Sequence, residues 1–405
     1  MKLSYLTKQI FYILIIYEAF SIPFFKDVSV LRFLGNTLFT DISTIYFCFV
    51  VVGIFKYLPL KDVPKNQKII YVILSYSLYQ IFIVLPLTIS EQGFKREYIL
   101  LLIIRFSFLS ILFFYWFILP LFKKNNTPIK IIEIVGIILI AISIYKYASG
   151  IRNYTNSGES RLASGVSTII FAPIIFFNFK FFGAKKNNYF FGFIALTGLI
   201  FANHRSGYIS LAIISIINIF FLKKNSKYFI KQLLSVFSLV LFLFFFIKIP
   251  YVQINFLPRI KESYNLKDKN YIDRYEKNLL SFEYFKNNPI NGSLLKNIFY
   301  EKNTVKKEEM WQPHNSVLSI LASQGIVGFL FIFILFFMII KIAYKNRYDK
   351  LSYQMMLSSI YYFLFSLANA MFFGVSSIFI LCLYFSIILY RNKLLTQNKN
   401  KFILN

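Results

Sequence analysis

The amino-acid sequence predicts an all-α protein: a polytopic bundle of about twelve transmembrane helices with one large, partly helical outer loop. Apolar residues make up 57% of the 405 residues and charged residues only 15%, whereas a soluble domain has roughly 25% charged residues. Long apolar runs also recur along the chain. Because the chain lacks the charge to cover a soluble core, a soluble enzyme, a disordered scaffold and a secreted disulfide module are excluded.

The apolar runs define the predicted spans, since a helix needs about 20 apolar residues to cross the hydrocarbon core. Candidate spans lie at approximately 9–25, 42–58, 69–89, 98–122, 129–148, 166–183, 189–203, 207–222, 229–248, 326–343, 353–372 and 374–390. The amino terminus has a basic start and an apolar run without a small-residue cleavage site. We therefore expect a retained first span rather than a cleaved signal peptide.

The distribution of charge predicts the orientation of the chain. The formal net charge is +28, and Lys and Arg gather in alternate loops, such as 56–68, 123–130 and 223–231, and in the carboxy-terminal tail. The intervening loops have mixed charge, as at 91–97. Because basic loops stay in the cytoplasm, we expect both termini there. This explanation of the positive charge leaves no reason to expect nucleic-acid binding.

One predicted outer loop, residues 249–313, differs from the others. It is 65 residues long and holds 8 of the 17 acidic residues, and long loops without a function are uncommon. Within it, apolar residues recur at helical spacing before Asn288-Pro289 and Gly292 end the run: Ile272, Tyr275, Leu279, Phe282 and Phe285. The chain thus divides into a bundle of nine spans (1–248), a large outer, periplasmic loop (249–313) and a bundle of three spans (314–405).

Few residues in the predicted outer half of the bundle can carry proton or charge chemistry. The chain has two His, and both His204 and His314 fall on the outer side near the membrane. Imidazole titrates near neutral pH, although position alone favours His204 as an interfacial residue without a functional role. Arg105 lies in the outer part of the fourth span, where a charge is costly. It is a candidate for contact with a lipid phosphate or, alternatively, for a structural pair with Glu18.

Three stretches of the sequence resemble one enzyme family. Residues 313–336, PHNSVLSILASQGIVGFLFIFILF, contain His-Asn-x-x-Leu followed by Gly-x-x-Gly. Residues 197–207, TGLIFANHRSG, are similar to a Thr-x-Ser-Arg-Gly-like turn, and Asp273-Arg274-Tyr275 followed by NPING at 288–292 is similar to an Arg…Pro-x-x-Gly stretch. Taken in their order along the chain, the three stretches resemble the O-antigen ligase/polymerase superfamily over about residues 160–345. The departures are a His before Arg205 and Ile-Asn-Gly after Pro289.

This resemblance implies a glycosyltransferase that joins undecaprenyl-diphosphate-linked glycans at the outer face of the bacterial inner membrane. It implies His314 as the general base and Arg205 and Arg274 as catalytic residues, because a planar guanidinium suits diphosphate oxygens. By position alone, Arg205 is an interfacial anchor and Arg274 a solvated loop charge. The substrate-binding candidates are Arg161, whose neighbourhood loosely resembles another family motif, together with Arg105, His204 and Asn315.

The sequence predicts no metal or cofactor. It contains no Asp-x-Asp, no His-x-x-His and no glycine-rich phosphate loop, and Cys48 and Cys382 both lie in apolar runs. A lipid-diphosphate donor carries its own leaving group, which fits a metal-independent enzyme. The expected partners are the lipid-linked glycan, membrane lipid and a chain-length regulator.

Three functions stay open. A polymerase, which joins one lipid-linked repeat unit to another, is favoured. A ligase, which joins finished polymer to lipid A-core, shares every motif quoted above. A glycolipid flippase is the third candidate, but it would place its charges along a central cavity and would not need a 65-residue outer loop.

Overall fold

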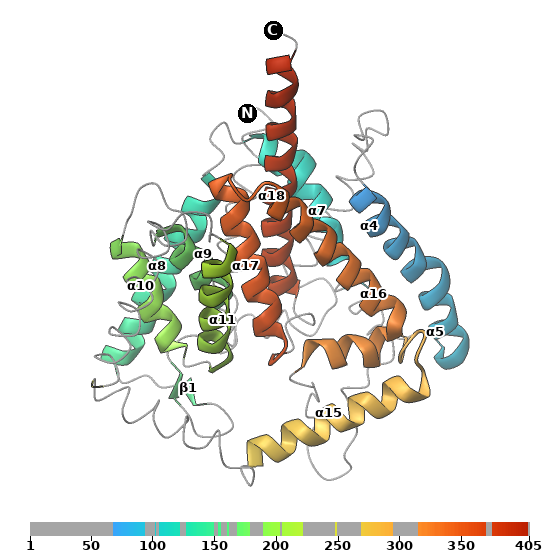
Figure 1. The fold of residues 1–405 in the computed structure, drawn as a ribbon. Helices are drawn as coiled ribbons and strands as arrows, with labels where there is room; N and C mark the ends of the chain where they lie inside the picture. The colour runs from blue at the N-terminus through green and yellow to red at the C-terminus, as the bar shows by residue number, and fades with distance from the viewer. Residues whose placement is uncertain are drawn as a thin grey trace, which may run out of the picture. The chain divides into compact units, whose positions relative to one another are not determined.

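The structure is a computed structural model that describes residues 68–93, 102, 105–121, 127–149, 153–154, 160–161, 168–178, 189–202, 205–221, 248, 269–294, 315–369 and 375–403. The predicted first and second spans, residues 229–247 of the ninth span, His204 and His314 lie outside these ranges. So does the large predicted loop apart from residues 269–294. Apart from its turns and one pair of very short strands, the described part is helical (Figure 1), in agreement with the all-α prediction.

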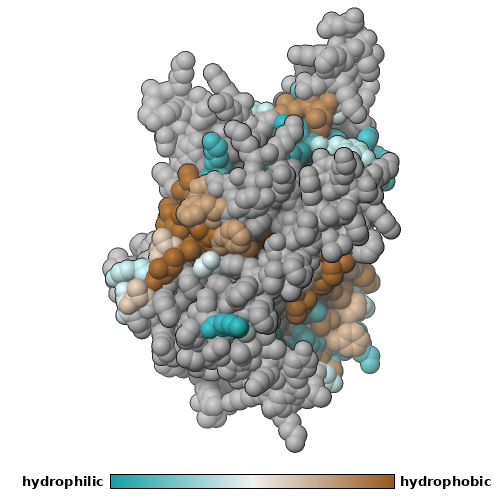
Figure 2. Space-filling model, turned by 60° about the vertical axis from the view of Figure 1, so that its left-hand side comes forward, coloured by the Kyte–Doolittle hydropathy of each residue, from teal (hydrophilic) through white to brown (hydrophobic). Residues whose placement is uncertain are grey.

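Three described helical segments are long and apolar enough to cross a membrane: Lys68–Glu91, Ser316–Lys345 and Ile378–Gln397. They coincide with the predicted third, tenth and twelfth spans. Shorter apolar helices fall within the predicted fourth to eighth spans, at Ser107–Trp116, Ile132–Ala141, Thr168–Asn178, Phe190–Leu199 and Ser206–Asn218. Apolar side chains also gather on the surface (Figure 2), where Phe82, Phe190 and Phe337 are more than half exposed. The described part is that of a membrane protein, and the total of twelve spans stays a prediction.

The chain divides into two compact units, of which the first comprises residues 1–127, 276–359 and 366–405. Its first described helix is continuous through α4 (Lys68–Tyr79), the π-helical turn η2 (Gln80–Val84) and α5 (Leu85–Gln92). Four short helices follow, η3 (Ser107–Leu109), α7 (Ser110–Phe113), η4 (Phe114–Ile118) and η5 (Leu119–Leu121). The long helices α16 (Ser316–Lys345) and α18 (Val375–Ile403) complete its helical part, together with α17 (Lys350–Ser366) apart from residues 360–365.

Aromatic rings form much of the core of this first unit. Helix α18 packs against α16, α7 and η4, and α4 packs against α16 and η3. Phe331 of α16 stacks on Tyr76 of α4 with ring centroids 3.7 Å apart, and it meets the edge of Phe108 at 5.7 Å. Phe114 and Phe379 make a similar edge contact at 4.9 Å between η4 and α18. These contacts hold α4, the η3–η4 segment and α16 together around the site described below.

An ion pair joins the start of α17 to α18. Asp349 precedes α17, and its Oδ2 accepts hydrogen bonds from the backbone N–H of Ser352 at 3.0 Å and from Nε of Arg391 in α18 at 3.1 Å. Nη2 of Arg391 donates to the second carboxylate oxygen. Asp349 is therefore both the amino-terminal cap of α17 and one half of a bidentate pair.

The second unit comprises residues 128–275 and 360–365. It contains α8 (Thr127–Ala148), α9 (Thr168–Asn178), α10 (Tyr189–Phe201) and α11 (Arg205–Phe221). All residues of α9 are buried, and this helix packs on α10. The strands β1 (Asn153–Tyr154) and β2 (Ser160–Arg161) pair antiparallel, with Asn153 opposite Arg161. Glu133 of α8 accepts a hydrogen bond from Nδ2 of Asn178 at 3.0 Å, so this carboxyl in the predicted fifth span has a polar partner.

Candidate functional site

A short turn that follows α15 lies against α16 in the first unit. Helix α15 (Lys269–Asn287) ends where Asn288-Pro289 and Gly292 were predicted to stop it. Residues 288–294, here called the docking turn, are closed by a hydrogen bond from Gly292 N–H to the Asn288 carbonyl at 2.9 Å. Gly292 has φ +61° and Leu294 has φ +57°. A left-handed Leu is uncommon, which indicates that the surroundings determine the path of this turn.

The docking turn replaces part of the hydrogen-bond ladder of α16. Gly325 has φ +61° and ψ −164°, so the helix is kinked there. In a regular helix the N–H groups of Ile326 and Val327 would bond to the carbonyls four residues earlier. Instead, they donate to the carbonyls of Pro289 and Ile290, at 2.8 and 3.4 Å. The kink therefore creates backbone donors that bind the turn.

The carbonyls released by the kink also find partners. The Ala322 carbonyl accepts from Ser293 N–H of the docking turn at 2.9 Å. The Ser323 carbonyl accepts from Nη2 of Arg105 at 2.9 Å. An unpaired backbone group is costly in a buried interior, and Ala322 and Ser323 are both buried, so these two bonds stabilise the kink.

Arg105 joins the docking turn, α16 and η2. Its side chain is buried, with 6% exposed. Nη1 donates to Oε1 of Gln80 at 2.7 Å, and Nη2 donates to the carbonyls of Leu294 and Ser323. The guanidinium thus binds three acceptors from three segments that are far apart in the sequence. In these contacts Arg105 has a structural role, because it binds backbone carbonyls of the docking turn and of α16. Glu18, the alternative partner, lies outside the described residues.

Two tyrosines of α4 add side-chain contacts to the same region. Tyr79 donates from its hydroxyl to Oδ1 of Asn291 in the docking turn at 2.5 Å. Tyr76 donates to Oε1 of the buried Gln324, next to the kink. Among residues inside the spans, only charged ones were candidates from the sequence, so Gln80 and Gln324 were not predicted. Polar amides within apolar runs were the available signal, because such groups also need partners in a membrane.

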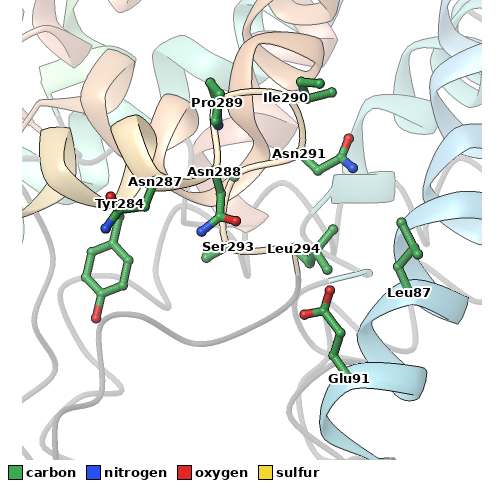
Figure 3. Close-up of a pocket in the computed structure, with 11 residues that line it drawn as sticks. Leu87, Glu91, Tyr284, Asn287, Asn288, Pro289, Ile290, Asn291, Ser293 and Leu294 are labelled. Atoms are coloured by element: carbon green, nitrogen blue, oxygen red, sulfur yellow. The ribbon is translucent and has the colours of Figure 1, made fainter.

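A pocket of about 350 Å³ opens beside the docking turn (Figure 3). One wall is formed by Leu87 and Glu91 of α5, and the opposite wall by Tyr284 and Asn287 at the end of α15. The remaining lining is the docking turn itself, from Asn288 to Leu294. Amide groups, one carboxylate and apolar carbons therefore border the same space.

The start of α16 is fixed by a predicted site residue. Asn315 caps the helix, since its Oδ1 accepts from the N–H groups of Val317 at 2.9 Å and Leu318 at 3.2 Å. The hydroxyl of Ser316 donates to the carbonyl of Asn369 at 2.5 Å. Asn315 was predicted to bind substrate, and here its side-chain oxygen organises the helix end that His314 directly precedes in sequence.

The other predicted site residues are placed as follows. Arg205 is the first residue of α11, and Arg161 is the last residue of β2, but their side chains are not among those described. Arg274 lies on α15 with its side chain exposed. His204 and His314 lie outside the described ranges. Of the predicted charged residues, Arg105 is the one that the described contacts connect to the docking turn.

Comparison with known protein families adds an independent observation. Residues 190–333 match a family model described as O-antigen ligase. The matched stretch includes α10, α11, α15, the docking turn and the kinked part of α16, whereas Arg105, Leu87 and Glu91 lie outside it. A comparison with curated proteins finds no match. The family match supports the superfamily that the three sequence motifs resemble.

Proposed function

We propose that this chain, which contains an O-antigen ligase family domain at residues 190–333, polymerises glycan repeat units in a membrane. Members of this family are membrane glycosyltransferase-like enzymes. The proposed substrates are undecaprenyl-diphosphate-linked oligosaccharides at the outer face of the bacterial inner membrane. The observation that carries the proposal is the family match, which falls on a chain with helices suited to a membrane.

The proposed reaction is a single displacement. A hydroxyl oxygen of the acceptor sugar attacks the anomeric carbon of the donor, and a new glycosidic bond forms. The bond between that carbon and the diphosphate oxygen breaks, and the lipid diphosphate leaves with the electron pair. The hydroxyl proton passes to His314, whose imidazole is suited to general-base catalysis near neutral pH.

Charge on the leaving group calls for cationic partners. We assign this role to Arg205 and Arg274, because a guanidinium presents paired donors to phosphate oxygens and stays charged at every physiological pH. Both residues lie within the matched family domain. A diphosphate is a sufficiently good leaving group with such partners, so the proposed reaction uses no metal. Transfer that persists in EDTA supports this part of the proposal, and loss that is restored by a divalent cation contradicts it.

The proposed orientation places both termini in the cytoplasm and residues 249–313 outside. Alternation of basic loops supports it. A topology reporter inserted after Lys307 tests it directly. Activity of a reporter that works only outside the cytoplasm is expected, and activity of a cytoplasm-specific reporter at the same position contradicts the orientation.

Ligation to lipid A-core is the second candidate, because the matching family model is described as O-antigen ligase. Membranes that contain the chain separate the two functions. They are supplied with labelled lipid-linked repeat unit, either alone or with lipid A-core. A ladder of lengthened lipid-linked glycans with repeat unit alone supports the polymerase. Label that moves only to lipid A-core supports the ligase and contradicts polymerisation.

A further inference from the structure

We propose that the pocket between α5 and the docking turn binds a neutral or amino sugar of the glycan, and that Glu91 selects it. This inference rests on the proposed function, because it assigns a subsite for the substrate of that reaction. Its volume of about 350 Å³ falls within the roughly 300–1,000 Å³ typical of ligand pockets. The pocket lies wholly within the first unit.

The lining has the chemistry that a hydroxylated ring requires. Side-chain amides of Asn287 and Asn288 each offer donors and an acceptor, and Asn291 adds its amide donors beside the bond to Tyr79. The Glu91 carboxylate can accept from several hydroxyls. Leu87 and Leu294 supply apolar carbon for the C–H face of a sugar. Figure 3 shows the carboxylate of Glu91 extending from α5 toward Leu294, with Asn288 and Asn291 on the opposite side. The polar groups thus border the pocket from two sides, α5 on one and the end of α15 with the docking turn on the other.

Three polar side chains that line the pocket, those of Glu91, Asn287 and Asn288, take no part in holding the docking turn. Backbone hydrogen bonds, Arg105 and Tyr79 fix the docking turn. Within the described part of the chain, no hydrogen bond or ion pair engages the side chains of Glu91, Asn287 or Asn288, and all three are exposed. A rigid turn therefore presents polar groups that are still available to a ligand, as a preorganised subsite requires.

Charge decides which sugar the pocket accepts. Glu91 is the one charged side chain among the eleven lining residues. A carboxylate attracts hydroxyl and ammonium donors and repels a like charge, so an acidic sugar is disfavoured. Glu91 and Leu87 also lie outside the matched family domain, whereas the opposite wall lies inside it. The α5 wall therefore adds to the domain a specificity element from another part of the chain.

The test uses the purified full-length protein in lipid nanodiscs and saturation-transfer NMR. The probes are methyl glucoside, methyl galactoside, methyl N-acetylglucosaminide and methyl glucuronide. At least one neutral glycoside is expected to bind, and glucuronide more weakly than glucoside. Glu91→Gln should remove this discrimination, and Glu91→Ala with Asn288→Ala should weaken neutral binding about tenfold or more, the scale of losing hydrogen bonds to a charged group.

The matched control is Glu283→Gln, which makes the same change on exposed α15 surface beside the pocket but not in its lining. It should leave binding unchanged, and equal melting temperatures of all variants establish that each is folded. Absence of binding by every neutral glycoside overturns the inference, as does binding that the Glu91 and Asn288 changes do not weaken.

A transfer assay in the same nanodiscs separates the two proposals. Transfer of lipid-linked glycan without Glu91-dependent sugar binding overturns the subsite and leaves the proposed function standing. Glu91-dependent binding in a protein that transfers no glycan contradicts the proposed function and supports the sugar pocket alone.

Discussion

Gly292 and Gly325 face each other so closely that a β-carbon on either residue would lie 2.6 Å from the backbone nitrogen of the other. Both have φ +61°, a region that disfavours other L-residues. The docking turn and the kinked helix α16 thus touch backbone to backbone, and the two glycines are what permits this. Their positions 292 and 325 belong to the two motifs that resembled family signatures in the sequence.

Alanine at Gly325 is predicted to prevent stable folding of the first unit. Its β-carbon would lie 2.1 Å from the carbonyl oxygen of Ile290, so the turn would have to leave the helix. Gly93 provides a matched control because it has similar dihedrals, φ 69° and ψ 179°, and open space around its β-carbon position. Gly93→Ala should lower the free energy of unfolding only by the backbone strain, which is of order 1–3 kcal/mol.

Thermal unfolding in detergent measures the comparison. Gly325→Ala and Gly292→Ala should melt well below Gly93→Ala or fail to accumulate in the membrane. Equal melting temperatures for Gly325→Ala and Gly93→Ala would show that the close approach of the two backbones does not exist.

Substitution of Arg105 is predicted to release the docking turn without unfolding α18. Arg105→Met leaves the carbonyls of Leu294 and Ser323 without their donor, at about 1–3 kcal/mol for each group left unpaired. Arg105→Lys should restore only part of the loss, because an ammonium cannot reproduce the spacing of three fixed acceptors. Hydrogen exchange of peptides that cover 288–294 and 322–327 is the measurement.

The surface residue Arg347 is the control, and Arg347→Met should leave exchange at both segments unchanged. Exchange in Arg105→Met that matches the wild type at 288–294 would contradict the bridging role of Arg105.

The sequence predicted the positions of the described helices but not how polar groups join them. Apolar runs identified Lys68–Glu91 and Ser316–Lys345, because length and composition alone decide membrane helices. The stop at Asn288-Pro289 was also predicted correctly. The kink at Gly325 was not predicted. It depends on the docking turn about 35 residues earlier in the chain, and local periodicity does not encode such a distant partner. For the same reason, the sequence predicted Arg105 in an apolar fourth span but could not name its hydrogen-bond acceptors.

Acid is predicted to weaken the Asp349–Arg391 pair. Burial by itself would raise the pKa of Asp349, but hydrogen bonds from Arg391 and Ser352 and the charge of Arg391 lower this pKa below its ordinary value of 3.8. A carboxyl whose pKa is lowered by folding adds stability above its unfolded pKa and loses it as pH falls through the folded pKa. The contribution should therefore be constant from about pH 5 to 8, begin to fall near about pH 4, and be lost completely only below the lowered pKa of the folded state.

Asp349→Asn tests this dependence, since Asn also caps a helix well but carries no charge. Its melting temperature should be lower than that of the wild type at neutral pH, and the difference should shrink in acid. A difference that stays constant down to pH 3 would mean that the charge of Asp349 contributes nothing.

The two arginines that we propose as partners of the diphosphate are predicted to require the guanidinium shape. Arg205→Ala should abolish almost all glycan transfer, and Arg205→Lys should retain only part of it, because an ammonium cannot form paired bonds to phosphate oxygens. Arg274→Ala should behave like Arg205→Ala. Surface glycan length at equal membrane abundance is the readout. Normal polymer from Arg205→Ala would show that this residue is only an interfacial anchor.

The candidate site was predictable in its residue types and less so in its lining. Asn315 and Gly325 lie together in one motif, but the sequence did not predict their roles as the cap and the kink of α16, and the role of His314 stays a prediction. Glu91 was treated as loop charge, because nothing in residues 91–97 indicates that α5 ends beside the docking turn. Sequence patterns along one segment reveal capping and helix ends, whereas a pocket wall from a distant span becomes visible only in three dimensions.

Glycan transfer by purified protein tests the proposed function most directly. Wild type, His314→Ala and His204→Ala are reconstituted in vesicles at equal amounts with labelled undecaprenyl-diphosphate-linked repeat unit, and product length is measured. Wild type and His204→Ala should form a ladder, and His314→Ala should be slower by about 100- to 10,000-fold while it still binds the donor. A wild type that forms no glycosidic bond, or a His314→Ala variant that forms the normal ladder while His204→Ala is inactive, would contradict this prediction.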